Sequence, residues 1–272
     1  YSPERIDPGK NKILKKLPYY KINKLISGYT KNCEISIKKL YKNIFKNIHL
    51  CKSIKVAETS KIFENIFRAV NIGLVNEMKI LTSKMNINIH DVVESAGTKP
   101  FGFKKFAPGP GVGGHCIPID PIFMKWIATK YKHKTQFIDL GAKMNIQVTD
   151  WIINKIIKLI NKKKIVKCLV LGVAYKADIN DIRESPSIKI IKKLSTLKNC
   201  KVDFMDPYVN GIKINSLLLK SKKVSNFRSY DLTILCTDHY KFNYKKILDE
   251  SRKIVDTRGK FKDSKLSKIY HF

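Results

Sequence analysis

The 272-residue chain lacks several features that mark common classes of protein. It has no apolar run of about 18 residues, so no membrane span is expected. Its opening, YSPERIDPGK, does not have the basic and then apolar layout of a secretory signal. The six cysteines are scattered without a CxxC pair, which argues against a disulfide framework or a zinc site. We therefore expect a protein of the reducing cytoplasm that holds no metal.

Arginine is also scarce, although the formal net charge is +32. Only six of the 54 basic residues are Arg, which leaves 54 − 6 = 48 Lys, spread over the whole chain beside abundant Ile and Asn. Such a charge can indicate a nucleic-acid or anionic-membrane surface. Proteins that read bases or phosphates, however, favour Arg forks and stacked aromatics. We interpret the charge as composition, the product of A/T-rich codons, with nucleic-acid binding as the alternative.

The first 160 residues have mainly helical patterns. In AETSKIFENIFRAVNIGLVNEMKILTSKM apolar residues recur at steps of three and four, which predicts an amphipathic helix. NINIHDVVESAG predicts a shorter helix that is capped by Asn or Asp and ends at Gly97. Helix-like stretches are also expected around LPYYKINKLISGY, EISIKKLYKNIF and DPIFMKWIATKYK, and a very long helix over about 136–162.

After about residue 160 the pattern changes. KIVKCLVLGVAY, CKVDFMDPY, DLTILCTD and KIVDTRG are short runs rich in Val, Ile and Leu, which is typical of buried parallel strands. Helix-like segments such as SPSIKIIKKLSTL lie between them. Strands and helices that alternate in this way predict βαβ units and a doubly wound parallel sheet. The expected fold class is α/β, with a helical part followed by a Rossmann-like part.

One stretch, APGPGVGGHCIPIDP (107–121), concentrates glycine and proline around a single thiol. A lone cysteine is usually a small buried hydrophobe, but four glycines here let the backbone approach a ligand and offer N–H groups to a developing oxyanion. Asp120 follows Cys116 by four residues, so both lie on one face if a helix begins near Cys116. Asp120-Pro121 is otherwise a helix-entry turn, and we interpret His115 as structural.

Four stretches together resemble the UDP-glucose/GDP-mannose dehydrogenase family. They are SPERIDPG, AETSKIFENIFRAVNIGLVNE, the loop with GHCIPIDP, and LGVAYKADINDIRESPSIKII. They run in family order over nearly the whole chain, and the loop is most similar to the branch that acts on UDP-N-acetylhexosamines. The resemblance implies an all-helical central dimerisation domain and a UDP-binding domain. It implies an enzyme that oxidises the C6 alcohol of the sugar to an acid with two NAD⁺, through a thiohemiacetal and thioester on cysteine.

The resemblance also assigns roles to residues of this chain. Cys116 would be the nucleophile, Lys61 and Asn65 would stabilise the oxyanion from one helix face, and Glu4 and Asp120 would handle protons and water. The residues implied in binding UDP-sugar are Tyr175, Lys176, Arg258, Gly113 and Lys99, and Arg183 would reach the cofactor phosphates. Each has a plainer reading: Glu4 could pair with Arg5, and Arg183 with Asp178, Asp181 or Glu184.

A dinucleotide fingerprint is missing, because no GxGxxG follows a strand and VLGVAYKAD has a single glycine. The chain therefore resembles the C-terminal two-thirds of the family's enzymes. The predicted domains are 1–10 as a remnant of the NAD-binding domain, 11–160 as the central domain and 161–272 as the UDP-binding domain. A homodimer is expected through the long helix. The alternative is an inactive fragment that binds UDP-sugar or serves in assembly.

Overall fold

The computed structural model of the chain describes residues 1–6, 18–160 and 164–272. The chain divides into two compact units, Tyr1–Phe67 and Arg68–Phe272. Part of the predicted helical stretch before Pro18, and part of the SPERIDPG motif, lie outside the described residues. The predicted domain limits at residues 10 and 160 stay predictions.

The first unit contains a small parallel strand pair. Its elements are η1 (Tyr19–Lys21), β1 (Lys24–Ile26), α2 (Lys31–Lys42), β2 (Ile48–Leu50) and the start of α3 (Ile54–Lys84). The helix predicted in EISIKKLYKNIF is confirmed as α2, which Thr30 caps by accepting from the Cys33 N–H. The helix predicted around LPYYKINKLISGY is wrong over its described part, because that part forms η1 and β1.

Lys24 explains why the sequence pattern predicted a helix where β1 forms. All of β1 is buried, yet it begins with a lysine that helical patterning places on a polar face. The Lys24 ammonium donates to the Pro3 carbonyl at 3.2 Å and lies 5.2 Å from the centroid of the Tyr41 ring. A buried ammonium with a carbonyl and an aromatic face is compensated, so tertiary contacts outweigh the local pattern.

The helices of the second unit confirm the sequence patterns. Those that precede the sheet are the rest of α3, α4 (Ile89–Ala96), α5 (Asp120–Lys130) and the long α6 (Gln136–Leu159). The Asn88 side chain caps α4, and Gly97 ends it, as predicted. α3 and α6 approach closely at two glycines, since a Cβ on Gly73 would lie 2.9 Å from the Gly141 carbonyl oxygen.

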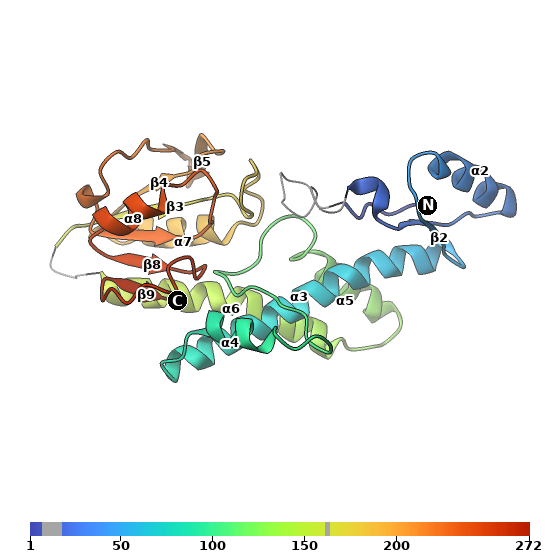
Figure 1. Ribbon diagram of the computed structural model, residues 1–272, viewed down its shortest axis with the longest axis horizontal. Helices are drawn as coiled ribbons and strands as arrows, with labels where there is room; N and C mark the ends of the chain where they lie inside the picture. Colours follow the sequence, from blue (N-terminus) through green and yellow to red (C-terminus); the bar gives the residue numbers. More distant parts are fainter. Residues whose placement is uncertain (7–17, 161–163) are drawn as a thin grey trace. The chain divides into compact units, whose positions relative to one another are not determined.

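A five-stranded parallel sheet forms the rest of the second unit (Figure 1). Its strands are β3 (Val166–Leu171), β4 (Cys200–Met205), β7 (Leu232–Leu235), β8 (Ile254–Asp256) and β9 (Ile269–His271), in the order β4-β3-β7-β8-β9. The direction in which strands are added reverses between β3 and β7. In open parallel sheets, ligands bind outside the carboxyl ends of the strands at such a switch point. β5 (Gly211–Ile214) and β6 (Leu217–Lys220) form a separate antiparallel hairpin, and Ile212 and Ile214 of β5 join the apolar core of the sheet.

Both faces of this sheet are covered. Cys168 and Val170 point toward α6 and α7 (Pro186–Ser195), whereas Leu169 and Leu171 point toward α8 (Tyr244–Glu250) and the short η2 (Phe227–Ser229). Alternation of side chains along a strand places neighbours on opposite faces, and each face has its own apolar core. This confirms the doubly wound α/β architecture, with β9 and the hairpin as additions that the sequence patterns did not predict.

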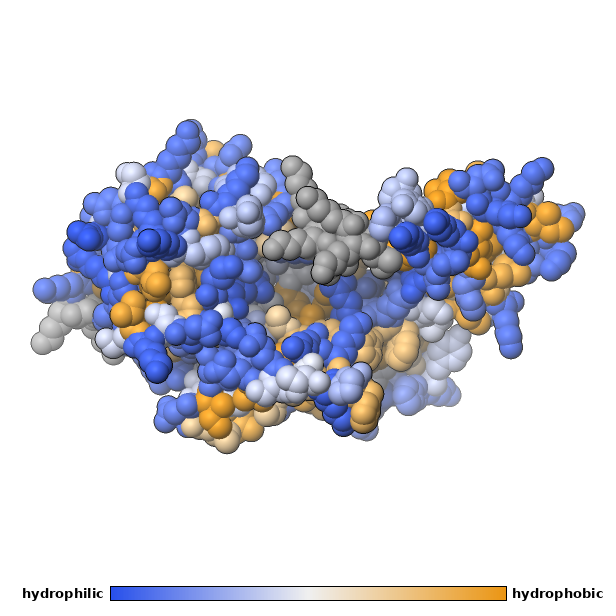
Figure 2. All heavy atoms as spheres, in the orientation of Figure 1, coloured by the Kyte–Doolittle hydropathy of each residue, from blue (hydrophilic) through white to orange (hydrophobic). Residues whose placement is uncertain are grey.

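The surface differs between parts of the second unit. In Figure 2 most of the visible surface over the sheet is hydrophilic, whereas hydrophobic atoms gather along the lower edge, over α3 and α4. Within the residues that the structure describes, no helix combines the length and the apolar character needed to cross a membrane.

Candidate active site

The cysteine loop is packed directly onto the crossover that follows β3. The Gly114 N–H donates to the Arg183 carbonyl at 2.8 Å. A Cβ on Gly113 would lie 2.6 Å from the Cβ of Tyr175, and one on Gly114 would lie 2.8 Å from the Tyr175 ring. Gly114 also has a φ of +87°, in the region that favours glycine. The glycines are therefore required so that the loop can reach Tyr175.

Cys116 is exposed and lies in a turn before α5. Its carbonyl accepts from the N–H groups of Ile119 and Asp120, the latter at 2.8 Å. Asp120 is the first residue of α5, so the predicted helix begins one turn later than Cys116. The backbone hydrogen bond from Asp120 to Cys116 still places the two residues one turn apart.

Buried polar side chains fix the start of the loop to α3 and α6. Asn76 accepts from the Gly109 N–H at 3.1 Å and donates to Asn145 at 3.1 Å. Lys79 donates to the carbonyls of Gly109 and Thr257, and Thr149 donates to that of Pro110. Every one of these four side chains is at least nine-tenths buried. Sequence patterning treated them as ordinary helix positions and missed them.

Arg258 joins the same region from the end of β8. Its Nε donates to the Cys236 carbonyl at 2.6 Å, and its backbone N–H donates to Asp256 at 2.9 Å. A Cβ on Gly109 would lie 2.8 Å from Nη1 of Arg258, so the guanidinium rests against the start of the cysteine loop. The loop that carries Cys116 thus contacts Arg258 at Gly109 and Tyr175 at Gly113 and Gly114.

Burial and nearby charge shift three pKa values in the region of Arg258. Burial, followed by repulsion from Arg258, lowers the pKa of Lys79 to about 7. Burial, followed by repulsion from Lys79, lowers the pKa of His90 to about 4. Cys236 is buried directly after β7, and burial raises the pKa of its thiol to about 12. A neutral Cys236 is a structural thiol rather than a second nucleophile.

Other predicted site residues make local contacts. The exposed guanidinium of Arg183 binds the Asp181 carboxylate through Nε and Nη2, the latter at 2.6 Å, as one of the plainer readings had it. This pairing lowers the pKa of Asp181. Lys99 is exposed, with its ammonium 4.9 Å from the centroid of the Phe101 ring. Lys176 is half-buried beside Tyr175.

Three predicted catalytic residues belong to the first unit. Lys61 and Asn65 lie one turn apart on α3, with Lys61 half-buried and Asn65 buried. Glu4 is exposed; its Oε1 accepts from the N–H groups of Arg5 and Ile6, and its Oε2 lies 3.9 Å from Lys24. The proposed side-chain pair between Glu4 and Arg5 does not form, because the Arg5 guanidinium binds Glu64 at 2.6 Å.

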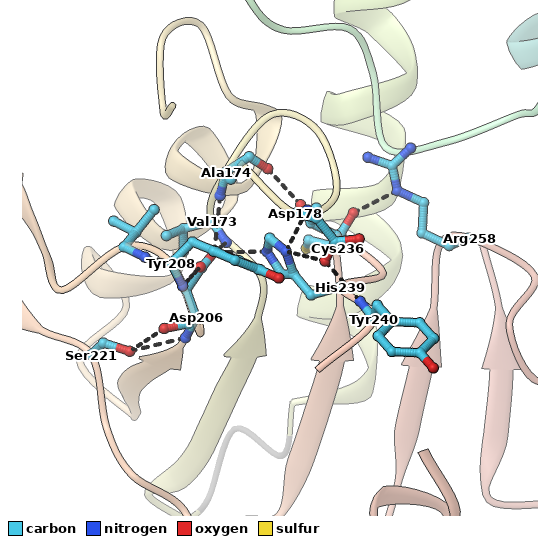
Figure 3. Close-up of polar contacts among 12 residues, drawn as sticks. Val173, Ala174, Asp178, Asp206, Tyr208, Ser221, Cys236, His239, Tyr240 and Arg258 are labelled. Carbon is cyan, nitrogen blue, oxygen red and sulfur yellow. Dashed lines mark hydrogen bonds and ion pairs between the residues drawn. The ribbon is translucent and has the colours of Figure 1, made fainter. Parts of the chain in front are cut away.

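At the switch point lies a buried pair that sequence reasoning missed, Asp206 and His239 (Figure 3). Asp206 directly follows β4, and His239 comes four residues after the end of β7. His239 Nε2 and Asp206 Oδ2 are 3.0 Å apart. The available signal was position, since polar residues just past the carboxyl ends of parallel strands are candidates for a ligand site.

A cavity of about 610 Å³ opens beside the cysteine loop, between the loop, α6 and the start of α7. Its lining is mostly apolar, with Glu184, Lys189 and Lys192 as its charged members. Neither Cys116 nor Arg258 lines it. The part of the cysteine loop that lines this cavity consists of Val112, Ile117, Pro118 and Ile119.

Comparison with known proteins matches two domain models to the chain. Residues 55–147 match the central domain of the UDP-glucose/GDP-mannose dehydrogenase family, and residues 169–263 match the UDP binding domain of that family. These two models cover the cysteine loop, Tyr175, Arg183 and Arg258.

Curated proteins and solved structures give the same result. The chain is 34% identical over 250 residues to UDP-N-acetyl-D-glucosamine 6-dehydrogenase of Salmonella typhi, covering 89% of this chain and 57% of that protein. It is 32% identical to UDP-N-acetyl-D-mannosamine dehydrogenase of Methanococcus vannielii, covering 95% and 60%. The structure of a UDP-D-ManNAc dehydrogenase from Pyrococcus horikoshii superposes with a TM-score of 0.81 at 28% identity, covering 99% and 63%.

The chain spans about three-fifths of the length of these relatives. The matched part includes both domain models in family order, with the predicted helical and α/β architecture. The chain belongs to the UDP-glucose/GDP-mannose dehydrogenase family and carries that family's central and UDP-binding domains.

Proposed function

We propose that this chain supplies the nucleophile and the UDP site of a nucleotide-sugar 6-dehydrogenase that oxidises the C6 alcohol of a UDP-N-acetylhexosamine to a carboxylate. The observation that carries the proposal is the packing of the cysteine loop on Tyr175 and Arg258. A half-buried aromatic ring and a guanidinium suit uracil and diphosphate, and an exposed thiol lies on the same loop.

The proposed thiol chemistry assigns a role to each of the predicted catalytic residues. Loss of a hydride from C6 and of the hydroxyl proton would first turn the alcohol into an aldehyde. The Cys116 sulfur would then bond to C6, and the thiol proton would go to the carbonyl oxygen, which gives a thiohemiacetal. Loss of a second hydride from C6 and of the hydroxyl proton would turn that adduct into a thioester, and attack by water would release the carboxylate and the free thiol. Asp120 would orient the water from one turn away. Lys61 and Asn65 would donate to the oxygen on C6, and Glu4 would be a further proton acceptor.

NAD⁺ is the proposed acceptor for both hydrides, but the described residues do not fit a dinucleotide cradle. A single glycine, Gly172, follows β3, and α7 begins only at Pro186. A pyrophosphate fingerprint instead needs several glycines in a short turn that leads directly into a helix. Arg183, the proposed phosphate contact, is paired with Asp181. Lys99 and Gly113 are proposed to contact the sugar-nucleotide.

UDP binding by this chain tests the proposal directly. Calorimetry with UDP, UDP-N-acetylglucosamine, UDP-N-acetylmannosamine and UDP-glucose should give binding of the N-acetylated sugars. Arg258→Ala should weaken binding about 10- to 100-fold, because it removes charge-assisted hydrogen bonds to diphosphate. Arg252→Ala is the matched control, since Arg252 makes an exposed ion pair with Asp231. Absence of binding to every UDP-hexose would overturn the proposal.

Turnover separates catalysis from the alternative of a binding module. A fusion of this chain to the nicotinamide-binding part of a relative should produce NADH and sugar acid. Cys116→Ala in that fusion should abolish acid formation while UDP-sugar binding is retained. A fusion that binds UDP-sugar and NAD⁺ without forming acid would favour a binding or assembly role.

We also infer a homodimer formed through the helical part of the second unit. Large apolar side chains are exposed there on α3, α5 and α6: Leu74, Met78, Leu81, Phe123, Trp126, Phe137, Leu140 and Ile146. Exposed apolar groups on this scale favour association. Light scattering should give twice the chain mass at micromolar concentration, and Leu81→Ser should shift it toward the monomer. A monomer at all concentrations would contradict the inference.

A further inference from the structure

The buried carboxylate of Asp206 ties three segments together at the switch point. Its Oδ2 accepts from the N–H groups of Val173 and Ala174, at 2.7 and 3.1 Å. Its Oδ1 accepts from those of Tyr208 and Val209, at 2.8 and 3.0 Å. Burial opposes ionisation, but the hydrogen bonds from His239 and the backbone outweigh it and lower the pKa of Asp206. Asp206 is therefore a satisfied, ionised acceptor.

His239 completes the cluster in a defined protonation state. Its side chain is fully buried, and its Nδ1 accepts from the Asp178 N–H at 3.0 Å. A ring nitrogen that accepts carries no proton, so the proton of the neutral ring is on Nε2, which donates to Asp206. His239 thus connects Asp206 to Asp178, as Figure 3 shows.

Asp178 is held in a conformation that it would not choose alone. Its φ is +63°, which is uncommon for a residue other than glycine. Its N–H donates to His239, and its Oδ1 accepts from the Tyr240 N–H at 2.9 Å. Such backbone strain persists only where the surroundings over-determine it. These contacts come from the segment after β7, so two strand ends fix one loop.

The loop that is held in this way is 173–178, and it carries Tyr175 and Lys176. Asp206 binds the amides at its start, and His239 binds the amide at its end. Thr237 adds a hydrogen bond to the Ala174 carbonyl at 2.6 Å. Val173 and Ala174 also belong to the apolar core on the α7 face of the sheet, so the start of the loop is packed as well as hydrogen-bonded. A buried ionised carboxylate is a poor source of stability, and specifying a conformation is one use of such groups.

We propose that Asp206 and His239 are positioning residues that set Tyr175 and Lys176 for the uridine diphosphate of the substrate. The inference rests on the proposed function, since it assumes that Tyr175 and Lys176 contact UDP. Neither Asp206 nor His239 is proposed to touch the nucleotide. They act through the backbone of the loop 173–178.

Variants of His239 separate its two hydrogen bonds. His239→Asn keeps an acceptor at the position of Nδ1, His239→Gln keeps a donor near the position of Nε2, and His239→Leu keeps neither. We expect UDP affinity to fall in the order wild type, then Asn and Gln, then Leu, with a loss of about tenfold or more in the last. Asp206→Asn should lower UDP affinity as much as His239→Leu does, because its NH₂ group would face one pair of backbone N–H donors.

A matched control removes a buried hydrogen bond elsewhere in the same sheet. Ser251 is buried and donates to Thr233 at 3.1 Å, near the amino ends of β7 and β8. Ser251→Ala should lower the melting temperature without changing UDP affinity. Hydrogen exchange gives a local readout: the amides of 173–178 should lose protection in the His239 variants, while those of β3 and β7 keep theirs.

The outcomes distinguish the two proposals. If the wild-type chain does not bind UDP by calorimetry, the proposed function fails. If the wild type binds UDP and the His239 variants bind it equally well, or lose affinity only in proportion to melting temperature as Ser251→Ala does, the positioning role is overturned. Should His239→Leu fail to fold, the Asn and Gln variants decide between these results.

Discussion

The sheet and the helical part of the second unit differ in how far their apolar side chains are buried. The strands β3, β7 and β8 are almost entirely buried, with a separate core on each face. The helices α3, α5 and α6 leave large apolar side chains such as Phe137 exposed, at 79%. A parallel sheet covered on both faces is complete by itself, whereas an exposed apolar helix face requires a partner. If the proposals above hold, assembly would depend on the helices and nucleotide recognition on the sheet.

The largest effect is expected when one apolar side chain is truncated in the sheet and another on the helices. Leu169→Ala empties a fully buried position on β3 and should lower the free energy of unfolding by about 2–5 kcal/mol. Phe137→Ala should change it by less than about 0.5 kcal/mol in the monomer. Urea unfolding at low protein concentration measures both. Equal losses would show that the helical face is as tightly packed as the sheet.

Gly113→Ala tests the contact between the cysteine loop and the β3 crossover. The new Cβ would lie 2.6 Å from the Cβ of Tyr175, so the loop must move, at a cost of about 1–3 kcal/mol. UDP affinity should fall with it. Gly211→Ala on β5 is the control, since its nearest contact would be 3.3 Å and so far milder. An unchanged UDP affinity in Gly113→Ala would show that the loop and Tyr175 are uncoupled.

Lys79 makes stability depend on pH at the junction of helices and sheet. Its pKa is about 7 in the folded chain and 10.5 ordinarily, so between these values the unfolded state binds more protons. The free energy of unfolding therefore rises with pH in that window. The cost of burying the protonated Lys79 is present in full below pH 7 and disappears toward pH 10.5. Relative to Lys79→Met, the wild type should gain about 1 kcal/mol from pH 7.5 to 8.5. Parallel pH profiles for the two proteins would contradict this.

The smallest effect is expected at an exposed ion pair that joins α6 to α7. Lys189 and Asp150 are 2.7 Å apart, with side chains about half exposed. Asp150→Ala should cost less than about 0.5 kcal/mol, and the cost should vanish in high salt. Thermal unfolding at two salt concentrations measures it. A salt-independent loss above 1 kcal/mol would mean that this contact is part of the core.

The sheet was predicted well because its signal is local. Short Val-, Ile- and Leu-rich runs give β3, β4, β7 and β8 directly. β9 was missed because three residues near the chain end carry almost no pattern, and β1 was missed because Lys24 is compensated by distant groups. Local patterns do not encode such partners.

Only part of the candidate site could be predicted from local sequence patterns. Cys116 and the glycines around it were visible as a local cluster, and the family motifs identified Tyr175 and Arg258. Asp206 and His239 were not visible, since they are 33 residues apart and meet only when β4 and β7 flank β3. The same applies to Asn76 and Asn145, which are 69 residues apart.

The sequence by itself determined the family, the alternation of strands and helices, and the thiol loop with its glycines, because each depends on residues that are neighbours along the chain. The tertiary structure alone decided which polar groups are buried together, as at Asp206 with His239 and at Lys79 with Gly109 and Thr257. The physical reason is that a buried charge is tolerated only where folding brings donors and acceptors from separate segments within hydrogen-bond distance.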